Sequence, residues 1–226
     1  MRLLVINPNT TAAMTEAAVA QVQRLLGPDA EVRGVTASSG PPVIASRESF
    51  VAGAHAALQA WHGMPADTRG RLDGVILACF GDPGLAALQE VCGVPVAGMA
   101  QAALREAIGA GRPYRIITAG AAWEAMLLDT VRLEQATGLL DGIVVLQGTG
   151  LDAARDRQGF VALVQDALDR AAGEGSPTVI LGGAGFAGFR ESLRYPGLLI
   201  DGLEAAARSM LAVGNALENH GKQGKA

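Results

Sequence analysis

The feature that most constrains the fold of this chain is a regular alternation of two kinds of segment. Short runs rich in valine, isoleucine and leucine are followed by longer alanine-rich stretches with apolar residues at helical spacing. Several short runs are apolar on both faces, as expected of strands covered by helices on each side. The alternation predicts an α/β fold with mostly parallel sheets. The expected strands are 2–6, 31–36, 73–78, 94–97, 114–118, 142–146, 178–182 and 198–200, and the expected helices are 11–26, 47–62, 83–92, 99–110, 121–137, 155–172, 187–194 and 202–218.

The chain also repeats itself. VILACFGDPGLAAL begins at Val75 and VILGGAGFAGF begins 104 residues later at Val179, and the same offset relates Gly98 to Gly202. The repeat predicts two pseudo-symmetric lobes, with an active-site cleft between them where the loops after the repeated strands meet. Chance similarity among apolar strands is the alternative. The expected division is lobe 1 at 1–98 plus 203–218, lobe 2 at 99–202, and a mobile polar tail at 219–226.

Composition excludes several classes of protein. The formal net charge of −4 gives no basic surface for nucleic acid or an anionic membrane, and no apolar stretch is long enough for a membrane span. Lysine occurs only at Lys222 and Lys225, which argues against a pyridoxal cofactor or a P-loop. Three histidines and two cysteines form no zinc motif, so we expect no metal and no cofactor. Without a disulfide framework or a long apolar leader, we expect a cytoplasmic protein.

Cys79 is the residue with the clearest chemical interest. It follows the strand at 73–78, where ligands bind in parallel sheets. Asp82 is expected to cap the helix at 83–92, which would place the thiol at a helix N-terminus and lower its pKa. The amides of Phe80 and Gly81 would then be able to hold a carboxylate or an oxyanion. The alternative is that Cys79 is a small buried apolar residue.

Other strand ends supply further candidates. Gly183 is equivalent to Cys79 in the repeat and lies in a glycine-rich loop at 182–186, whose amides allow close approach of a ligand. A tight turn without a ligand is the alternative there. Asn9 and Thr10 follow the first strand and offer an amide and a hydroxyl, although helix capping is the simpler explanation.

Two more segments complete the candidate pocket. Thr118 closes the strand at 114–118 and is expected to point into the same region, with a satisfied strand-end hydroxyl as the alternative. The segment at 38–49, which is rich in glycine and proline and contains Ile44, is expected to form a lid or pocket wall. Trp123 lies on an expected helix and is interpreted as a packing residue.

Taken together, these motifs resemble one enzyme family. NPNTT at 7–11, GPPVIAS at 40–46, ACFGDPGL at 78–85, RIIT at 115–118 and LGGAGF at 181–186 resemble the aspartate/glutamate/hydantoin racemase superfamily, and most closely its hydantoin and allantoin racemase branch. The resemblance covers residues 1 to about 212. It implies a cofactor-independent enzyme with two α/β lobes and a cleft between them. In such racemases one cysteine thiolate removes a proton next to a carbonyl, and a second thiol returns a proton to the opposite face.

The resemblance assigns the first cysteine to Cys79 and reveals one departure. The family motif usually reads LGCAGM, and this chain reads LGGAGF, so Gly183 replaces the second cysteine. The resemblance also implies that the substrate is held by side chains after the strands and by amides of the two loops. The expected substrate-binding residues are Asn9, Thr10, Ile44, Phe80, Gly81, Thr118, Gly183, Ala184 and Gly185, with Cys79 as the catalytic residue.

We therefore expect a metal-free isomerase that takes or returns a proton at the acidic carbon of a small hydantoin-like or α-substituted acid substrate through Cys79. Two alternatives stay open because Gly183 has no proton to give. One is a single-cysteine decarboxylase of a malonate-type acid, which would resemble the arylmalonate decarboxylase branch. The other is a catalytically idle small-molecule binding protein of the same fold. Alanine- and leucine-rich helices with few charges also predict a homo-oligomer.

Overall fold

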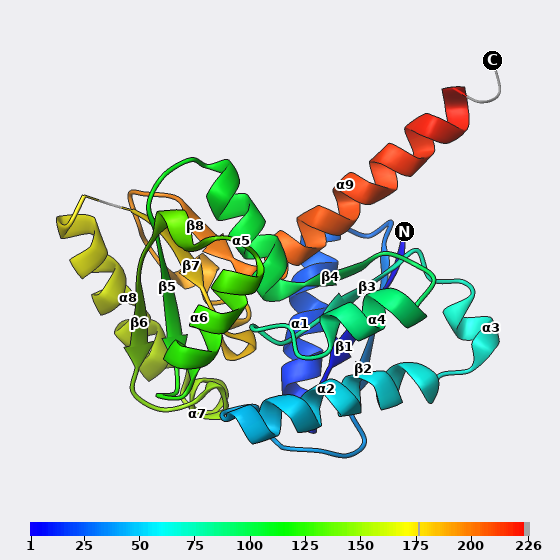
Figure 1. Ribbon diagram of the computed structural model, residues 1–226, viewed down its shortest axis with the longest axis horizontal. Coiled ribbons are helices and arrows are strands. Elements are labelled where there is room, and N and C mark those ends of the chain that lie inside the picture. Colours follow the sequence, from blue (N-terminus) through cyan, green and yellow to red (C-terminus); the bar gives the residue numbers. More distant parts are fainter. Residues whose placement is uncertain (176, 224–226) are drawn as a thin grey trace.

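Two parallel sheets form the framework of the molecule. The computed structural model describes residues 1–175 and 177–223, and within these ranges each sheet has four strands. The first sheet has the order β2-β1-β3-β4 and the second has the order β6-β5-β7-β8, so the two orders correspond strand for strand (Figure 1). The strands are β1 (Arg2–Asn7), β2 (Glu31–Thr36), β3 (Gly74–Leu77), β4 (Val96–Gly98), β5 (Tyr114–Ala119), β6 (Leu140–Leu146), β7 (Thr178–Leu181) and β8 (Leu199–Asp201).

The sheets confirm the expected fold class and the eight expected strands. The repeated apolar runs correspond to β3 and β7, which occupy the same place in their respective sheets. Both strands are buried along their whole length, which explains why they show no alternation of apolar and polar residues. The loops that follow them therefore leave equivalent strand ends.

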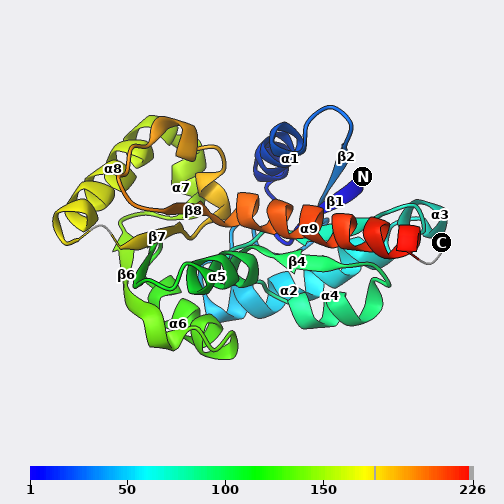
Figure 2. The same ribbon diagram turned by 90° about the horizontal axis from the view of Figure 1, so that it is seen from above.

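Helices cover both faces of each sheet. They are α1 (Ala12–Leu26), α2 (Arg47–His62), α3 (Ala66–Arg69), α4 (Leu85–Val91), α5 (Met99–Gly109), α6 (Trp123–Leu133), α7 (Gly150–Arg155), α8 (Arg157–Gly173) and α9 (Gly202–Gln223), with a short 3-10 turn η1 (Thr137–Leu139). In the first sheet α1 and α9 lie on one face, and α2 and α4 lie on the other (Figure 2). In the second sheet α5 and α6 lie on one face, and α8 lies on the other.

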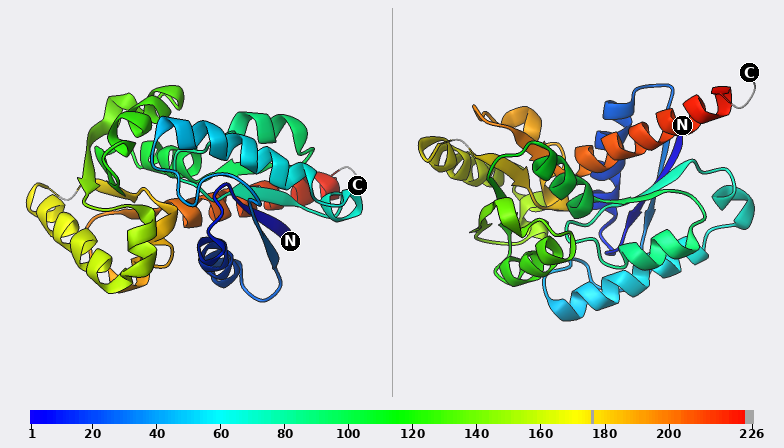
Figure 3. Two further views of the ribbon diagram at one scale, coloured as in Figure 1. Left: turned by 90° about the horizontal axis from the view of Figure 1, so that it is seen from below. Right: turned by 45° about the horizontal axis from the view of Figure 1, so that its top comes forward.

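The long helix α9 connects the two halves of the molecule. It begins directly after β8 of the second sheet and then packs along α1, α5 and β4 (Figure 3). The expected division at 1–98 plus 203–218 and 99–202 stays a prediction. The helix continues to Gln223, and residues 224–226 of the expected polar tail lie outside the described residues.

One expected helix does not form. Residues 187–194 contain one 3-10 turn, η3 (Arg190–Ser192), and the turn η2 (Ala184–Phe186) ends just before this range. Gly188 has a φ of +72°, which interrupts a right-handed helix at this point. The Arg157 guanidinium donates hydrogen bonds to the carbonyls of Ala187 and Gly188. The helix prediction is wrong because a side chain from α8, rather than the amides of a following turn, satisfies these carbonyls.

Within the described ranges, no helix combines the length and the apolar character needed to cross a lipid bilayer. The expected small-molecule partner and the homo-oligomer stay predictions.

The two sheets meet over a shared hydrophobic core. One buried cluster contains Ile76 of β3 together with Ile116 of β5. Phe80 lies at this junction, because a Cβ added at Gly182 would be 3.0 Å from its ring and one added at Gly202 would be 2.9 Å from it. Only glycine permits such close packing at both positions. The packing fixes the loop after β3 against the loop after β7.

Candidate active site

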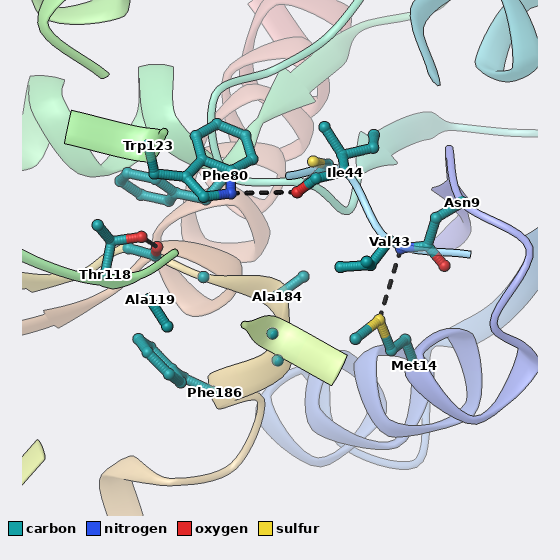
Figure 4. A pocket seen from close by; sticks show the side chains of 15 residues that line it. Asn9, Met14, Val43, Ile44, Phe80, Thr118, Ala119, Trp123, Ala184 and Phe186 are labelled. Carbon is teal, nitrogen blue, oxygen red and sulfur yellow. Dashed lines mark hydrogen bonds between the residues drawn. The ribbon is translucent and has the colours of Figure 1, made fainter. Parts of the chain in front are cut away.

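A small cavity lies where the strand-end loops of the two sheets meet. Its volume is about 50 Å³, which corresponds to a few water-sized groups and therefore to a small ligand. The walls come from the loops after β1, β3 and β7, the end of β5, the segment before α2, and the first turns of α1, α6 and α7 (Figure 4). The lining residues are Asn9, Met14, Val43, Ile44, Cys79, Phe80, Thr118, Ala119, Trp123, Gly150, Gly182, Gly183, Ala184, Gly185 and Phe186.

The cavity brings together most of the residues expected from the sequence, but two of them lie elsewhere. The amide of Thr10 donates to the carbonyl of Pro41 at 3.1 Å, and Thr10 does not line the cavity. Gly81 faces the rings of Trp123 and Phe50 and lines a separate surface groove. The other eight expected binding and catalytic residues line the cavity, and their roles stay predictions.

Cys79 lies two residues after the end of β3, with 6% of its surface exposed. Burial raises the pKa of the Cys79 thiol far above its usual range, and the negative charge of Asp82 raises it further. The expectation of a lowered pKa is therefore wrong. The physical reason is burial, which disfavours the charged form of the thiol, and α4 begins only at Leu85, so its N-terminus is not adjacent to Cys79.

Asp82 also departs from its expected place as the cap of the following helix. Gly84, with a φ of +81°, precedes α4 and provides no side-chain cap. The carboxylate of Asp82 instead accepts hydrogen bonds from the amides of Ala100 at 3.1 Å and Gln101 at 2.7 Å, at the start of α5. The helix that Asp82 caps is therefore α5 rather than α4.

Asn9 presents an oriented amide to the cavity. Its Oδ1 accepts from the side chain of Asn7 at 3.0 Å and from the amide of Thr11 at 2.9 Å, which fixes the plane of the group. Its Nδ2 donates to the sulfur of Met14 at 3.5 Å, and a thioether is a weak acceptor (Figure 4). The Nδ2 group is therefore able to donate to a ligand carbonyl at little cost.

Thr118 connects the two strand ends of the second sheet. Its hydroxyl donates to the carbonyl of Gly182 at 2.7 Å, within the buried wall of the cavity. The proton of this hydroxyl is therefore engaged within the protein, which agrees with the alternative of a satisfied strand-end hydroxyl. The oxygen still has lone pairs that a ligand donor would find in the wall.

The glycines of the loop after β7 differ in whether the surrounding structure leaves space for a side chain. A Cβ at Gly182 would lie 2.7 Å from the Ile116 side chain, and one at Gly185 would lie 2.5 Å from the carbonyl oxygen of Gly150. Gly183 is different, because its φ of −174° is ordinary extended backbone and a Cβ there would lie 3.4 Å from the nearest atom of Phe186. The backbone would therefore accept a side chain at Gly183.

Trp123 is the wall residue that sequence reasoning missed most clearly, since it was interpreted as packing. Its Nε1 donates to the carbonyl of Ile44 at 3.1 Å, which holds the segment before α2 against the cavity (Figure 4). Its ring also packs edge-on against Phe50, with centroids 6.4 Å apart. Its position just after a strand end is a signal that could have suggested a wall residue. No sequence signal links Trp123 to Ile44, 79 residues away.

The described residues contain no cluster of three or more histidine, cysteine, aspartate or glutamate side chains placed to hold a metal ion. The polar chemistry of the cavity therefore rests on one thiol, the Asn9 amide, the Thr118 hydroxyl and backbone groups.

Comparison with known proteins identifies the family. The family model described as Asp/Glu/Hydantoin racemase matches residues 3–210. The chain belongs to this family. It is 32% identical to a hydantoin racemase from Paenarthrobacter aurescens, over 95% of this chain and 92% of that protein. It is 33% identical to a hydantoin racemase from Rhizobium meliloti, over 96% and 91% of the two chains.

Solved structures in the family have the same fold. The allantoin racemase from Klebsiella pneumoniae superimposes with a TM-score of 0.84 at 28% identity, covering 96% of this chain and 88% of that one. The allantoin racemase from Pseudomonas fluorescens gives a TM-score of 0.87 at 25% identity, covering 96% and 92%. These relatives are named racemases, so the family membership makes this chain an enzyme of the racemase type.

The different surroundings of the two loop glycines predict different tolerance to substitution. Gly183→Ala is expected to change the free energy of unfolding by less than about 1 kcal/mol, because its Cβ enters ordinary van der Waals contact. Gly182→Ala is expected to destabilise by about 1–3 kcal/mol, because its Cβ overlaps Ile116 and Phe80. Urea denaturation of both variants measures the difference, and equal losses would contradict the loop geometry.

Proposed function

We propose that this chain is a racemase-type isomerase acting at the acidic carbon of a small hydantoin-like ring, with Cys79 as the group that takes and returns the proton. The observation that supports this most is that Cys79 is the one ionisable side chain among the described residues lining the cavity. Family membership and the hydantoin and allantoin racemases among its relatives support the substrate class.

The proposed reaction begins with the Cys79 thiolate. It removes the proton from the carbon beside the substrate carbonyl, which leaves a thiol and an enolate. The buried thiol has a raised pKa, so its thiolate is a strong base once formed, although little thiolate is present near neutral pH. The Asn9 Nδ2 group is placed to donate to a carbonyl oxygen on which negative charge develops.

Backbone amides supply further donors in this proposal. Ala184 and Gly185 are the first residues of the turn η2, where their amides have no acceptor within the turn. Both residues line the cavity on the side of the loop after β7. In a small enclosed site such amides stabilise an enolate oxygen without having to reorganise.

Gly183 determines the stereochemical outcome. It occupies the loop position equivalent to Cys79 and has no proton to donate, and no ionisable side chain among the described lining residues replaces it. Cys79 therefore returns a proton to the same face of the enolate, and in heavy water it returns deuterium once the thiol has exchanged with solvent. Inversion requires a proton from water on the opposite face and is the slower outcome.

Substitution of the two loop positions tests this assignment. In heavy water, Cys79→Ser is expected to slow the loss of the C5 proton of a 5-substituted hydantoin by at least about 10²-fold, because the hydroxyl is a much weaker acid–base group. Gly183→Cys is expected to increase inversion by up to about 10²-fold, because it adds a thiol to the facing loop. NMR measures exchange, and optical rotation measures inversion.

The matched control is Cys92→Ala. Cys92 is buried in a separate core cluster and does not line the cavity, so this variant is expected to exchange like the parent protein. Full exchange in Cys79→Ser would remove Cys79 from the reaction. No gain of inversion in a folded Gly183→Cys variant would show that the two loops do not face the same carbon.

The raised pKa of Cys79 predicts the pH dependence of exchange. The reactive thiolate is a small fraction of the protein near neutral pH, and this fraction grows as pH rises toward the raised pKa. The exchange rate is therefore expected to climb by up to about tenfold per pH unit between pH 7 and pH 9. Rates corrected with the Cys79→Ser protein measure this dependence. A plateau beginning below pH 7 would contradict a buried, hard-to-ionise thiol.

Gly183 also favours a second candidate function, a single-cysteine decarboxylase of a malonate-type acid. Such a reaction forms the enolate by loss of carbon dioxide, so one thiol is sufficient to complete it. Release of carbon dioxide from 2-substituted malonates, with one product enantiomer and no exchange of hydantoins, would favour this reaction. Ligand binding without either reaction would favour an idle binding protein.

A further inference from the structure

Asp82 lies three residues after Cys79 in the chain and does not line the cavity. Its amide donates to the carbonyl of Cys79 at 3.0 Å, which closes the loop after β3 into a tight turn. Its φ of +58° is in the left-handed region, which is uncommon for a residue other than glycine. Its carboxylate, 91% buried with the rest of the residue, accepts from the amides of Ala100 and Gln101 on α5.

The contact between Asp82 and α5 depends on a matching glycine. A Cβ at Gly98 would lie 2.3 Å from both Cγ and Oδ2 of Asp82, so any other residue there would displace the carboxylate. Gly98 is also the residue that precedes α5, and it offers no side chain to cap the helix. The cap of α5 therefore comes entirely from the loop that contains the thiol.

In the second sheet, the equivalent helix is capped by a residue close to it in the sequence. There the helix after the last strand is α9, and Asp201 at the end of β8 caps it by accepting from Leu203 at 2.9 Å and Glu204 at 3.0 Å. The comparison shows that a long-range cap is not required by the topology. In the first sheet it links the Cys79 loop to α5.

The carboxylate and the thiol occur on the same loop and are both missing from the other. The repeat places Gly183 at the position of Cys79 and Phe186 at the position of Asp82. Phe186 is an apolar residue that packs against Phe189, with ring centroids 5.4 Å apart. The loop without the thiol therefore has no equivalent of the Asp82 clamp.

We propose that Asp82 is a positioning residue for Cys79: its carboxylate, held on the first amides of α5, fixes the loop that presents the thiol to the cavity and keeps a negative charge beside it. Its effect on turnover rests on the proposed function, whereas its effect on the thiol does not. The left-handed turn at Asp82 lets its buried carboxylate accept from the two α5 amides, and these hydrogen bonds offset the strain of the turn.

The charged groups around Asp82 act together. Burial raises the pKa of Asp82 to about 7, the α5 amides oppose this shift, and the charge of Glu134 adds to it. Glu134 follows α6, where its carboxylate accepts from the Gln101 side chain at 2.8 Å and lies 3.8 Å from the Arg105 guanidinium. The carboxylate of Asp82 in turn contributes to the raised pKa of Cys79.

Alkylation of Cys79 tests the proposal independently of any substrate. The parent is the Cys92→Ala protein, so that iodoacetamide reports on one thiol, and the variants are Asp82→Asn and Asp201→Asn in that background. Asp82→Asn is expected to raise the alkylation rate several-fold at pH 9 and less at pH 7, because Asp82, with a pKa of about 7, carries its full charge only at the higher pH. Asp201→Asn removes a comparable buried carboxylate at the start of α9 and is expected to leave the rate unchanged.

Turnover supplies the second readout. Asp82→Asn is expected to lower kcat for hydantoin exchange by about 10- to 100-fold with little change in KM, because a misplaced thiol affects the transition state more than binding. An alkylation rate in Asp82→Asn equal to that of the parent, or raised equally by Asp201→Asn, would overturn the proposal. If no hydantoin exchanges in the parent protein, the proposed function fails while the alkylation comparison still decides the role of Asp82.

A second variant covers the case in which Asp82→Asn does not fold. Gly98→Ala keeps the Asp82 carboxylate but displaces it from the amides of α5, because the added Cβ would overlap it. Gly98 does not line the cavity, so the cavity wall stays unchanged. It is expected to raise the alkylation rate as well, because the loop loses its attachment and the charge moves. A folded Gly98→Ala protein with the parental alkylation rate would overturn the proposal.

Discussion

The packing of Phe80 against two glycines is the contact on which the rest of the site depends. The ring lies against Gly182 after β7 and against Gly202 at the start of α9, in space that only glycine leaves open. Because Phe80 follows Cys79 directly, this contact sets the thiol opposite the glycine-rich loop of the other sheet. The cavity is therefore a product of how the two sheets join, and neither sheet contains it alone.

Much of the framework was predictable from the sequence because parallel strands and the helices that cover them have strong local patterns. The segment that begins at Val75 is repeated at Val179, and this repeat was sufficient to predict that the loops after the two repeated strands would meet. What could not be predicted depends on contacts between distant residues. The hydrogen bond from Trp123 to Ile44 and the capping of α5 by Asp82 correspond to no periodicity or spacing in the sequence. The local preference of aspartate for helix N-termini predicted that Asp82 caps α4, whereas it caps α5.

The chemistry of the site is asymmetric although the fold is nearly symmetric. One loop has a buried thiol with a clamped carboxylate beside it, and the equivalent loop has Gly183, at which the backbone would accept a side chain. The loop conformation does not require glycine at position 183. The lack of a second thiol there is therefore not imposed by the fold. In the proposed function, such a site handles protons on one face of its substrate and depends on solvent for the other.

The ratio of exchange to inversion in the unmodified protein tests this central claim most directly. Each enantiomer of one 5-substituted hydantoin would be incubated separately in heavy water, with proton loss and optical rotation followed in the same sample. One-sided chemistry predicts that one enantiomer exchanges much faster than it inverts, and that the other exchanges slowly. Equal rates of exchange and inversion from both enantiomers would contradict it, because that result requires a second proton donor facing Cys79.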